Sequence, residues 1–527
     1  MADQTVTRES APGPAAENGA ACELGPETGT ARADHAFRVR LAAAEYERNL
    51  PLPEHPCNGD EHRYPNRIAS YSKALPHNDL GEVDAAAYDA LLKALDSGDQ
   101  ADFDRIPLGG SRKLANPRAA LAFSLEGPDS HHLGMPVAPT FDSAEEAAEM
   151  GEVYWQALTR DVPFAEYRTN RLTRAAAEDL SRFSAFEGPK ANGEVTTGTL
   201  FRGSTPGDLA GPYISQFLAR DVPYGAQTVA QRYKTAVPGR DYMVAYGEWL
   251  AIQEGASGGT TQLEEGQTRY IRNGRDLGEY VHRDFTYQAF LNATLILLQM
   301  KVGIDGDPYA RAKAEEGFVT FGAGHILDFV GKAAREALKA AWYQKWLVHR
   351  RLRPEAFGGR VHNHRAGRAD YPIHHELLRS SALRQVFRAH GSYLLPMAYA
   401  EGSPTHTAYP AGHAAISGAC ATMLKAFFDE SHEFGDVAVA APDGLSLQFQ
   451  TPTTDERLTV GGELNKLASN VSLGRDAAGV HWRSDGIEGL KLGEEVVIRI
   501  LTEEKLTYPE RFPGFALTGF DGTLRTV

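Results

Sequence analysis

The chain has 527 residues, of which 42% are hydrophobic and 23% are charged, and its formal net charge is −15. This composition is that of a folded globular protein with enough apolar material for a large core. The negative charge argues against a general binder of nucleic acid or of anionic membranes, because both partners attract a surplus of lysine and arginine.

The N-terminal segment is rich in Ala, Pro, Gly, Glu and Thr, and we expect residues 1–34 to form a disordered tail. It lacks a basic region followed by an apolar core, which argues against a Sec-type signal peptide and favours a cytoplasmic location. The most apolar window, residues 289–300, is shorter than the roughly 18 residues of a membrane span. Residues 35–527 show no internal repeat and no long linker, so we expect a single domain there.

Helical periodicity dominates the rest of the chain. Strand-like alternation is sparse, and residues 227–233 and 445–449 are the best short candidates for strands. Long connections containing Gly or Pro, such as 255–276 and 353–371, are expected to line a binding site. The predicted fold is mainly α, a large helical bundle with few short strands. Its helices are expected where apolar residues recur at steps of three and four, in residues 83–95, 143–158, 171–183, 208–218, 284–300, 324–346, 375–390, 412–428 and 484–504.

Three short segments concentrate cations and imidazoles, and the first is residues 342–354 (WYQKWLVHRRLRP). Lys345 lies near the end of a predicted helix, and Arg353 precedes a proline, which pushes its backbone out of the helical region. Lysine supplies a point charge, and arginine supplies a planar fork that can hold two oxygens of one anion. Taken alone, the segment also fits a basic helix end that complements the helix dipole.

The second segment, residues 404–417 (PTHTAYPAGHAAIS), carries two histidines seven residues apart, before and at the start of a predicted helix. Gly412 lets a backbone N–H approach an anion closely, and free N–H groups at a helix start favour negative charge. His413 alone is most simply a core histidine. With His406 at the other end of a proline-stiffened turn, a chemical role becomes an equal alternative.

The third segment, residues 470–482 (NVSLGRDAAGVHW), places Arg475 and His481 six residues apart, with a predicted flexible loop between them. We expect Ser484 or Asp485 to be the N-cap of the helix that follows. By itself the segment fits an arginine and a histidine on the surface. All three segments together could surround one oxyanion with the cations Lys345, Arg353 and Arg475.

The pattern Lys-x7-Arg-Pro, Pro-x-Gly-His and Arg-x5-His resembles the vanadium-dependent haloperoxidases and the related type-2 phosphatidic-acid-phosphatase-like acid phosphatases. The lysine-to-arginine spacing of eight is similar to the algal and bacterial bromoperoxidase branch, whereas fungal chloroperoxidases and most acid phosphatases have seven. The likeness covers most of residues 40–520, including 72–84 (SKALPHNDLGEVD), 211–217 (GPYISQF) and 284–290 (DFTYQAF). It implies a helical bundle of the haloperoxidase and acid phosphatase type.

The resemblance implies that vanadate is the cofactor and that His481 bonds the vanadium. Lys345, Arg353, Arg475 and the Gly412 N–H would bind the vanadate oxygens, and phosphate could occupy the same site. The implied activity is the use of hydrogen peroxide to oxidise bromide or iodide to hypohalous acid, which then halogenates organic acceptors. The resemblance also implies a homo-oligomer, either a dimer or a dodecamer built from dimers. No nucleic-acid or membrane partner is expected.

Further roles are implied for the residues around the vanadate. His413 would be the acid–base group toward hydrogen peroxide, and His406 would tune proton transfer. Asp284 would pair with the arginine of the third segment and orient it. Trp342 would pack beside the site.

Ala411 departs from the family pattern, which usually has serine at this position. The missing hydroxyl removes one neutral hydrogen bond, worth about 0.5–1.5 kcal/mol, which does not empty a site that holds three cations. We therefore expect weaker or altered peroxide activation, with the halide preference open. Ala411 also leaves open the alternative that the protein is a homologue that binds vanadate or phosphate with little turnover.

The sequence leaves two further alternatives. An acid phosphatase could use the same pocket, with His481 attacking phosphate and His413 protonating the leaving group. A divalent metal site at His374-His375-Glu376, or at His362 and His364, lacks partners at ligand spacing. None of the cysteines Cys22, Cys57 and Cys420 suggests a disulfide framework, and Cys420 is expected in the core.

Overall fold

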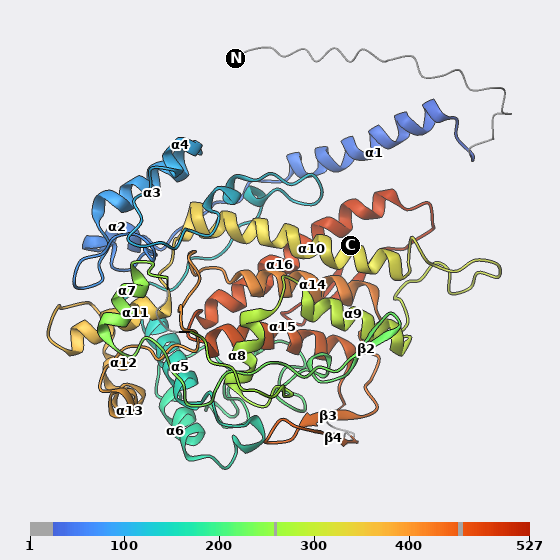
Figure 1. Cartoon of the computed structure of the whole chain (residues 1–527). Helices are drawn as coiled ribbons and strands as arrows, with labels where there is room; N and C mark the ends of the chain where they lie inside the picture. The colour runs from blue at the N-terminus through green and yellow to red at the C-terminus, as the bar shows by residue number, and fades with distance from the viewer. Residues whose placement is uncertain (1–24, 258–260, 452–456) are drawn as a thin grey trace. The chain divides into compact units, whose positions relative to one another are not determined.

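A computed structural model describes residues 25–257, 261–451 and 457–527 of the chain (Figure 1). The chain divides into two units, Met1–Asn49 and Leu50–Val527. Within the described residues, no helix has both the length and the apolar character that a membrane crossing requires.

The first unit contains helix α1 (Gly29–Asn49). Its sequence is rich in Ala, Arg and Glu, which have high intrinsic helix propensity. Residues 29–34, which the sequence analysis assigned to a disordered tail, are therefore helical in the structure. The rest of that predicted tail, up to residue 24, lies outside the described residues.

The second unit is mainly helical, as predicted. In the described part of this unit, the strands form three two-stranded antiparallel sheets: β1 (Val222–Tyr224) with β2 (Gln227–Val229), β3 (Val437–Ala440) with β4 (Leu447–Gln450), and β5 (Ala516–Thr518) with β6 (Leu524–Thr526). The helices are α2 (Asp60–Arg63), α3 (Ala85–Ser97), α4 (Gln100–Phe103), α5 (Ala144–Thr159), α6 (Arg171–Leu180), α7 (Tyr246–Gln253), α8 (Gly274–Arg283), α9 (Gln288–Met300), α10 (Ala323–Tyr343), α11 (Pro354–Arg365), α12 (His375–Arg379), α13 (Ser381–His390), α14 (Gly412–Phe427), α15 (Val460–Ala477) and α16 (Arg483–Glu504).

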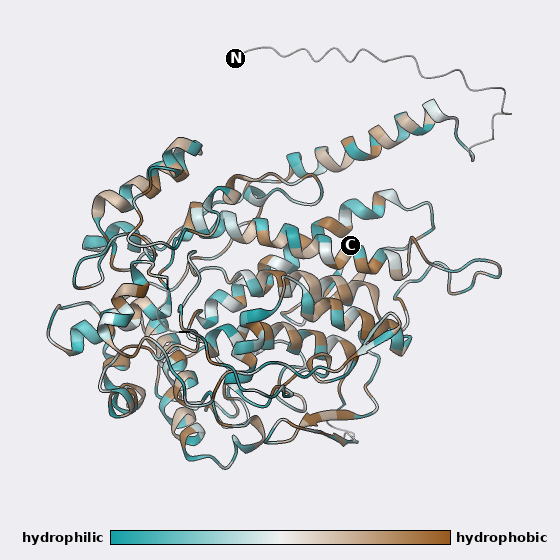
Figure 2. Cartoon of the chain, viewed as in Figure 1, coloured by the Kyte–Doolittle hydropathy of each residue, from teal (hydrophilic) through white to brown (hydrophobic). Residues whose placement is uncertain are grey.

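Helix α14 lies at the centre of the bundle, against α10, α15 and α16 (Figure 1). Hydrophobic residues are concentrated along these central helices (Figure 2). Gly418 of α14 and Gly493 of α16 allow the two helices to approach closely. A Cβ at Gly493 would lie 2.1 Å from the Ala415 carbonyl oxygen, so any side chain there would force the helices apart.

Most predicted helices lie where the periodicity places them, and two segments differ. Residues 208–218 contain only a short 3₁₀ turn at their end, because Gly211, with φ 60°, and Pro212 interrupt the pattern. Residues 375–390 form two helices, since Ser380 leaves the helical region and its side chain caps the start of α13.

Helices also occur where the sequence suggested loops. The predicted connection 353–371 contains α11, which begins at Pro354 in the favoured first helical position. The predicted connection 255–276 ends inside α8. Helix α15 was missed because almost all its side chains are buried, polar ones included, so it shows no amphipathic stripe.

Candidate oxyanion site

Lys345 lies in a π-helical segment, Gln344–His349, that continues α10. Its buried ammonium donates hydrogen bonds to the carbonyl oxygens of Thr407 and Ala408, both at 2.7 Å. An ammonium has three N–H donors, and the third has no acceptor among the described residues. Burial, together with the nearby charges of Arg353 and Arg475, holds the pKa of Lys345 well below its usual value.

Arg353 immediately precedes α11 with an extended backbone, as its position before a proline predicts. Its Nε and Nη2 donate to the His406 carbonyl at 3.0 and 2.9 Å, and Nη1 donates to the Val480 carbonyl at 2.7 Å. The same guanidinium reaches the ring nitrogens of two histidines, His481 Nε2 at 2.9 Å and His406 Nδ1 at 3.0 Å. Burial lowers the pKa of Arg353 to about 10. This arginine joins the second and third segments.

Arg475 occupies the last turn of α15, so it is not in the predicted loop. Its Nη1 donates to the Val281 carbonyl at 2.7 Å and lies 3.4 Å from the Tyr399 hydroxyl. Its Nε is buried and has no hydrogen-bond partner among the described residues. An unsatisfied charged donor in the interior is costly unless a ligand completes it.

A tight turn connects Arg475 to His481. The Val480 N–H bonds to the Arg475 carbonyl at 3.1 Å, and the Gly479 N–H bonds to the Asp476 carbonyl at 2.8 Å. With Gly479 at φ 84°, this is a Schellman motif that ends α15. The turn is therefore fixed rather than flexible, and it explains the six-residue spacing.

His481 is buried, and its two ring nitrogens have different partners. Nδ1 lies 2.7 Å from the Asp485 carboxylate, and Nε2 lies 2.9 Å from Nη1 of Arg353, which can only donate. The proton is thus assigned to Nδ1, and the Nε2 lone pair faces the cations. Burial and the charges of Arg353, Lys345 and Arg475 hold the pKa of His481 well below its usual range, so the ring is neutral.

Gly412 is the first residue of α14, and Ala411 before it makes no side-chain cap. The first hydrogen bond of the helix runs from Ala415 to Ala411, so the Gly412 N–H has no partner within the helix. A Cβ at Gly412 would lie 3.3 Å from the Trp342 ring. That indole also lies 4.8 Å from the His406 ring and 6.0 Å from Lys345 Nζ. Trp342 thus lies close to Gly412, His406 and Lys345.

His413 is partly accessible, with 31% of its side chain exposed. Its Nε2 lies 3.0 Å from Oδ1 of Asp284. The predicted pairing of Asp284 with Arg475 is wrong: the acid contacts His413, and Arg475 bonds to a carbonyl oxygen at the end of α8. A helix C-terminus presents free carbonyls that attract cations, which accounts for the difference.

The ring of carboxylates around Arg351 was missed by the sequence analysis. Asp485 is the third residue of α16 and accepts from the Trp482 N–H at 3.2 Å, so it supports the helix start without being the N-cap. A signal existed in the sequence: Glu146, Glu149 and Glu152 recur every three residues and are all buried on α5. Such spacing on one helix face predicts a buried cation opposite.

The charge balance of the site sets it apart from other buried cations. Lys73 is equally buried and also donates to two carbonyls, and its third partner is the Glu355 carboxylate at 2.7 Å. Within the part of the chain that the structure describes, neither Lys345, Arg353 nor Arg475 has a carboxylate within ion-pair distance. Three neighbouring buried cations without counter-charge form a site for an anion.

The other residue sets give no site. His362 and His364 accept hydrogen bonds from backbone N–H groups of Tyr393 and Tyr371, and His374 caps α12. Nowhere in the described residues are three or more His, Cys, Asp or Glu side chains placed to hold a metal ion. Cys420 is buried in the core, as expected.

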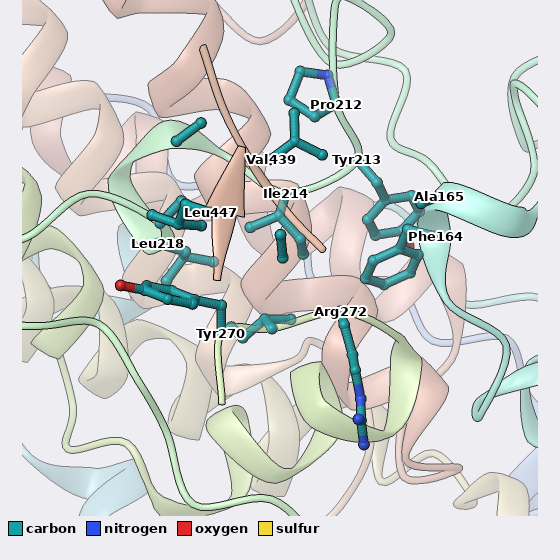
Figure 3. Close-up of a pocket in the computed structure, with 14 residues that line it drawn as sticks. Phe164, Ala165, Pro212, Tyr213, Ile214, Leu218, Tyr270, Arg272, Val439 and Leu447 are labelled. Carbon is teal, nitrogen blue, oxygen red and sulfur yellow. The ribbon is translucent and has the colours of Figure 1, made fainter. Parts of the chain in front are cut away.

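An apolar pocket of about 120 Å³ lies apart from these residues (Figure 3). Phe164 and Tyr213 stack in its wall, with ring centroids 3.9 Å apart. Its one cationic side chain, Arg272, is paired with Asp276 at 3.1 Å. The pocket therefore offers no unpaired charge to an oxyanion.

Known proteins are similar to the chain over nearly its whole length. The model of the VCPO second helical-bundle domain matches residues 325–505, which include all three motif segments. Vanadium-dependent bromoperoxidases of Corallina pilulifera and Ascophyllum nodosum are 36% and 38% identical, over 93% and 91% of this chain and 98% and 89% of theirs. The homohexameric second vanadate-dependent bromoperoxidase (AnII) of A. nodosum matches with a TM-score of 0.91 at 32% identity, covering 96% of this chain and 94% of that one.

Proposed function

The chain belongs to the vanadium-dependent bromoperoxidase family, and on this premise we propose that it is a vanadate-dependent haloperoxidase. It would use hydrogen peroxide to oxidise bromide or iodide, and the hypohalous acid produced would halogenate organic acceptors. The observation that carries the proposal is the group of buried cations that have no ion-paired carboxylate among the described residues, beside a neutral histidine.

The donor set fits a tetrahedral oxyanion. Lys345 would give its third N–H, Arg475 would give Nε, and Gly412 would give its backbone N–H at the positive end of the helix dipole. Arg353 would exchange its present contacts with the imidazoles for anion oxygens. His481, with its lone pair on Nε2, is in the protonation state that a metal ligand requires.

When bound, vanadate supplies Lewis-acid chemistry that makes an oxygen derived from peroxide susceptible to attack by halide. The protein supplies the electrostatic field and the protons. Lys345, Arg353 and Arg475 stabilise negative charge in a largely dry site, where such interactions are stronger than in water. His413, partly exposed and held by Asp284, can exchange protons between solvent and the site. His406, which shares Arg353 with His481, would modulate that exchange.

The activity is tested by bromination of monochlorodimedone with and without added vanadate, beside hydrolysis of p-nitrophenyl phosphate. We expect bromination that depends on both vanadate and peroxide, and slow hydrolysis. Rapid hydrolysis without bromination would favour the phosphatase instead. Tight oxyanion binding without turnover in either assay would mean a binding protein.

We also propose a homo-oligomer, which is supported by the homohexamer formed by the A. nodosum relative. A dimer and a dodecamer built from dimers are the assemblies expected from the family resemblance. Light scattering coupled to size-exclusion chromatography distinguishes these from a hexamer, and a monomeric mass would contradict the proposal.

A further inference from the structure

Arg351 lies between Lys345 and Arg353 in the sequence and is also buried. Unlike them, it is surrounded by carboxylates. Its guanidinium donates to Asp485 Oδ1 and to Glu149 Oε2, both at 2.8 Å, and it also donates to Glu146. Three carboxylates therefore already balance the charge of this guanidinium, although its Nε has no partner among the described residues, and we do not expect Arg351 to bind the anion. It must have another role if it has any in the reaction.

Asp485 lies at the junction between this carboxylate cluster and the oxyanion site. Oδ1 accepts from Arg351, while Oδ2 lies 2.7 Å from Nδ1 of His481. The backbone carbonyl of Asp485 also accepts from the Ala411 N–H at 2.9 Å, directly before Gly412. One fully buried residue thus holds both the imidazole and the start of α14.

We propose that Arg351 and Asp485 are positioning residues that fix the ring of His481 with its proton on Nδ1 and its Nε2 lone pair toward the anion. Glu146 and Glu149 of α5 anchor Arg351 from the opposite side, so the carboxylate of Asp485 has one orientation. Outer partners of this kind set the tautomer and basicity of a ligating histidine.

The alternative tautomer of His481 illustrates the physical need. A proton on Nε2 would face Nη1 of Arg353 at 2.9 Å, placing two donors against each other, and would leave no lone pair for a ligand. The Asp485 carboxylate can only accept when it is ionised, so it selects the proton on Nδ1. The inference rests on the proposed function for the identity of the anion, because only vanadate would bond to the imidazole.

The decisive variant is Asp485→Asn, which keeps the shape of the side chain but replaces one of its two oxygens by an NH2 group, a hydrogen-bond donor. That donor must face either Arg351 or His481. We expect vanadate affinity, measured by isothermal titration calorimetry, to fall about 10- to 100-fold. The affinity for inorganic phosphate, which uses the cations without a bond to the imidazole, should change less than about threefold.

Glu152→Gln is the matched control. Glu152 lies on the same face of α5 and pairs with Arg483 of α16 in an equally buried site, with a nitrogen–oxygen distance of 2.7 Å, and it does not contact His481. This variant measures the effect on anion affinity of weakening the contact between α5 and α16 in general. We expect it to leave both affinities unchanged. If Asp485→Asn does not fold, Glu149→Gln loosens Arg351 more gently and should shift vanadate affinity in the same direction.

Two outcomes would overturn the inference. One is unchanged vanadate affinity in Asp485→Asn or Glu149→Gln. The other is an equal loss of vanadate and phosphate affinity, which would indicate general damage to the site. Failure of the proposed function is seen separately, as a wild-type protein that binds vanadate no better than phosphate and does not brominate. Bromination kinetics add a check, because a misplaced ligand should lower kcat with little change in the KM for bromide.

Discussion

Replacing Lys345 by methionine tests the idea that an anion completes the buried cations. The structure sets the size of the effect. Two of the three N–H donors of the ammonium are used on the Thr407 and Ala408 carbonyls, so only one is left for the anion. One hydrogen bond to a charged group is worth about 1.5–3 kcal/mol, which corresponds to about 10- to 150-fold in affinity.

The assay is calorimetric titration of the anion-free protein with phosphate and with vanadate. Lys425→Met is the control, since this lysine is also buried and donates to Asn465 Oδ1 at 3.0 Å and to the Thr518 carbonyl at 2.6 Å. It lies 13 residues beyond Gly412 on α14, which is about 20 Å along the helix. The control should lower stability without lowering affinity.

The reasoning is refuted if Lys345→Met binds both anions as tightly as the wild type does. It is also refuted if the control loses as much affinity, because the effect would then come from loss of a buried charge anywhere in the bundle. Circular dichroism of each variant verifies that the helices remain intact before binding is compared.

Four other substitutions probe single features of the site. Arg475→Lys keeps the charge but removes the guanidinium fork whose Nε has no partner in the described residues, and phosphate affinity by calorimetry should fall about tenfold or more. His413→Ala should lower the bromination kcat by about 100- to 10,000-fold with nearly unchanged phosphate affinity, since it transfers protons without holding the anion. Burial raises the pKa of Glu146 from 4.5 to about 8. Between these two pH values the folded protein keeps a proton that the unfolded chain has lost, so the stability falls as the pH rises through this range. Glu146→Gln should flatten that slope in urea unfolding at pH 5 and pH 8. Ala411→Ser adds a donor at the start of α14 and should tighten vanadate binding about 2- to 12-fold in the same titrations.

The sequence alone was sufficient for the helical class, and it predicted a site at Lys345, Arg353, Arg475 and His481. Lysine, arginine and histidine at those spacings indicate an oxyanion site even where the local secondary structure is predicted wrongly. Helix α15 was not predicted because it carries buried Asn, Ser and Asp, so its polar residues do not mark an exposed face. Periodicity detects a helix when its apolar residues recur at steps of three and four, and it fails when many of the buried positions are polar.

The pairing of Asp284 could not be read from the sequence. Two donors, His413 and Arg475, are possible partners for one acid, and the choice depends on where the α8 carbonyls point. The role of Asp485 was equally hidden, because an acid near a helix start is normally explained by capping. Here Asp485 accepts a hydrogen bond from the Trp482 N–H at the start of α16 and also contacts His481.

The comparison of Lys73 with Lys345 connects the fold to the chemistry. Both ammonium groups are buried, both donate to two carbonyls, and the difference lies in the third position. At Lys73 that position holds Glu355, a partner fixed by the chain, so the charge is satisfied as soon as the protein folds. At Lys345 none of the residues that the structure describes supplies a carboxylate, and an exchangeable anion can satisfy the same geometric need. A structural ion pair and a cofactor site can thus share the same local arrangement of a buried lysine and two carbonyl oxygens. The ion pair has a carboxylate at the third position, and the cofactor site does not.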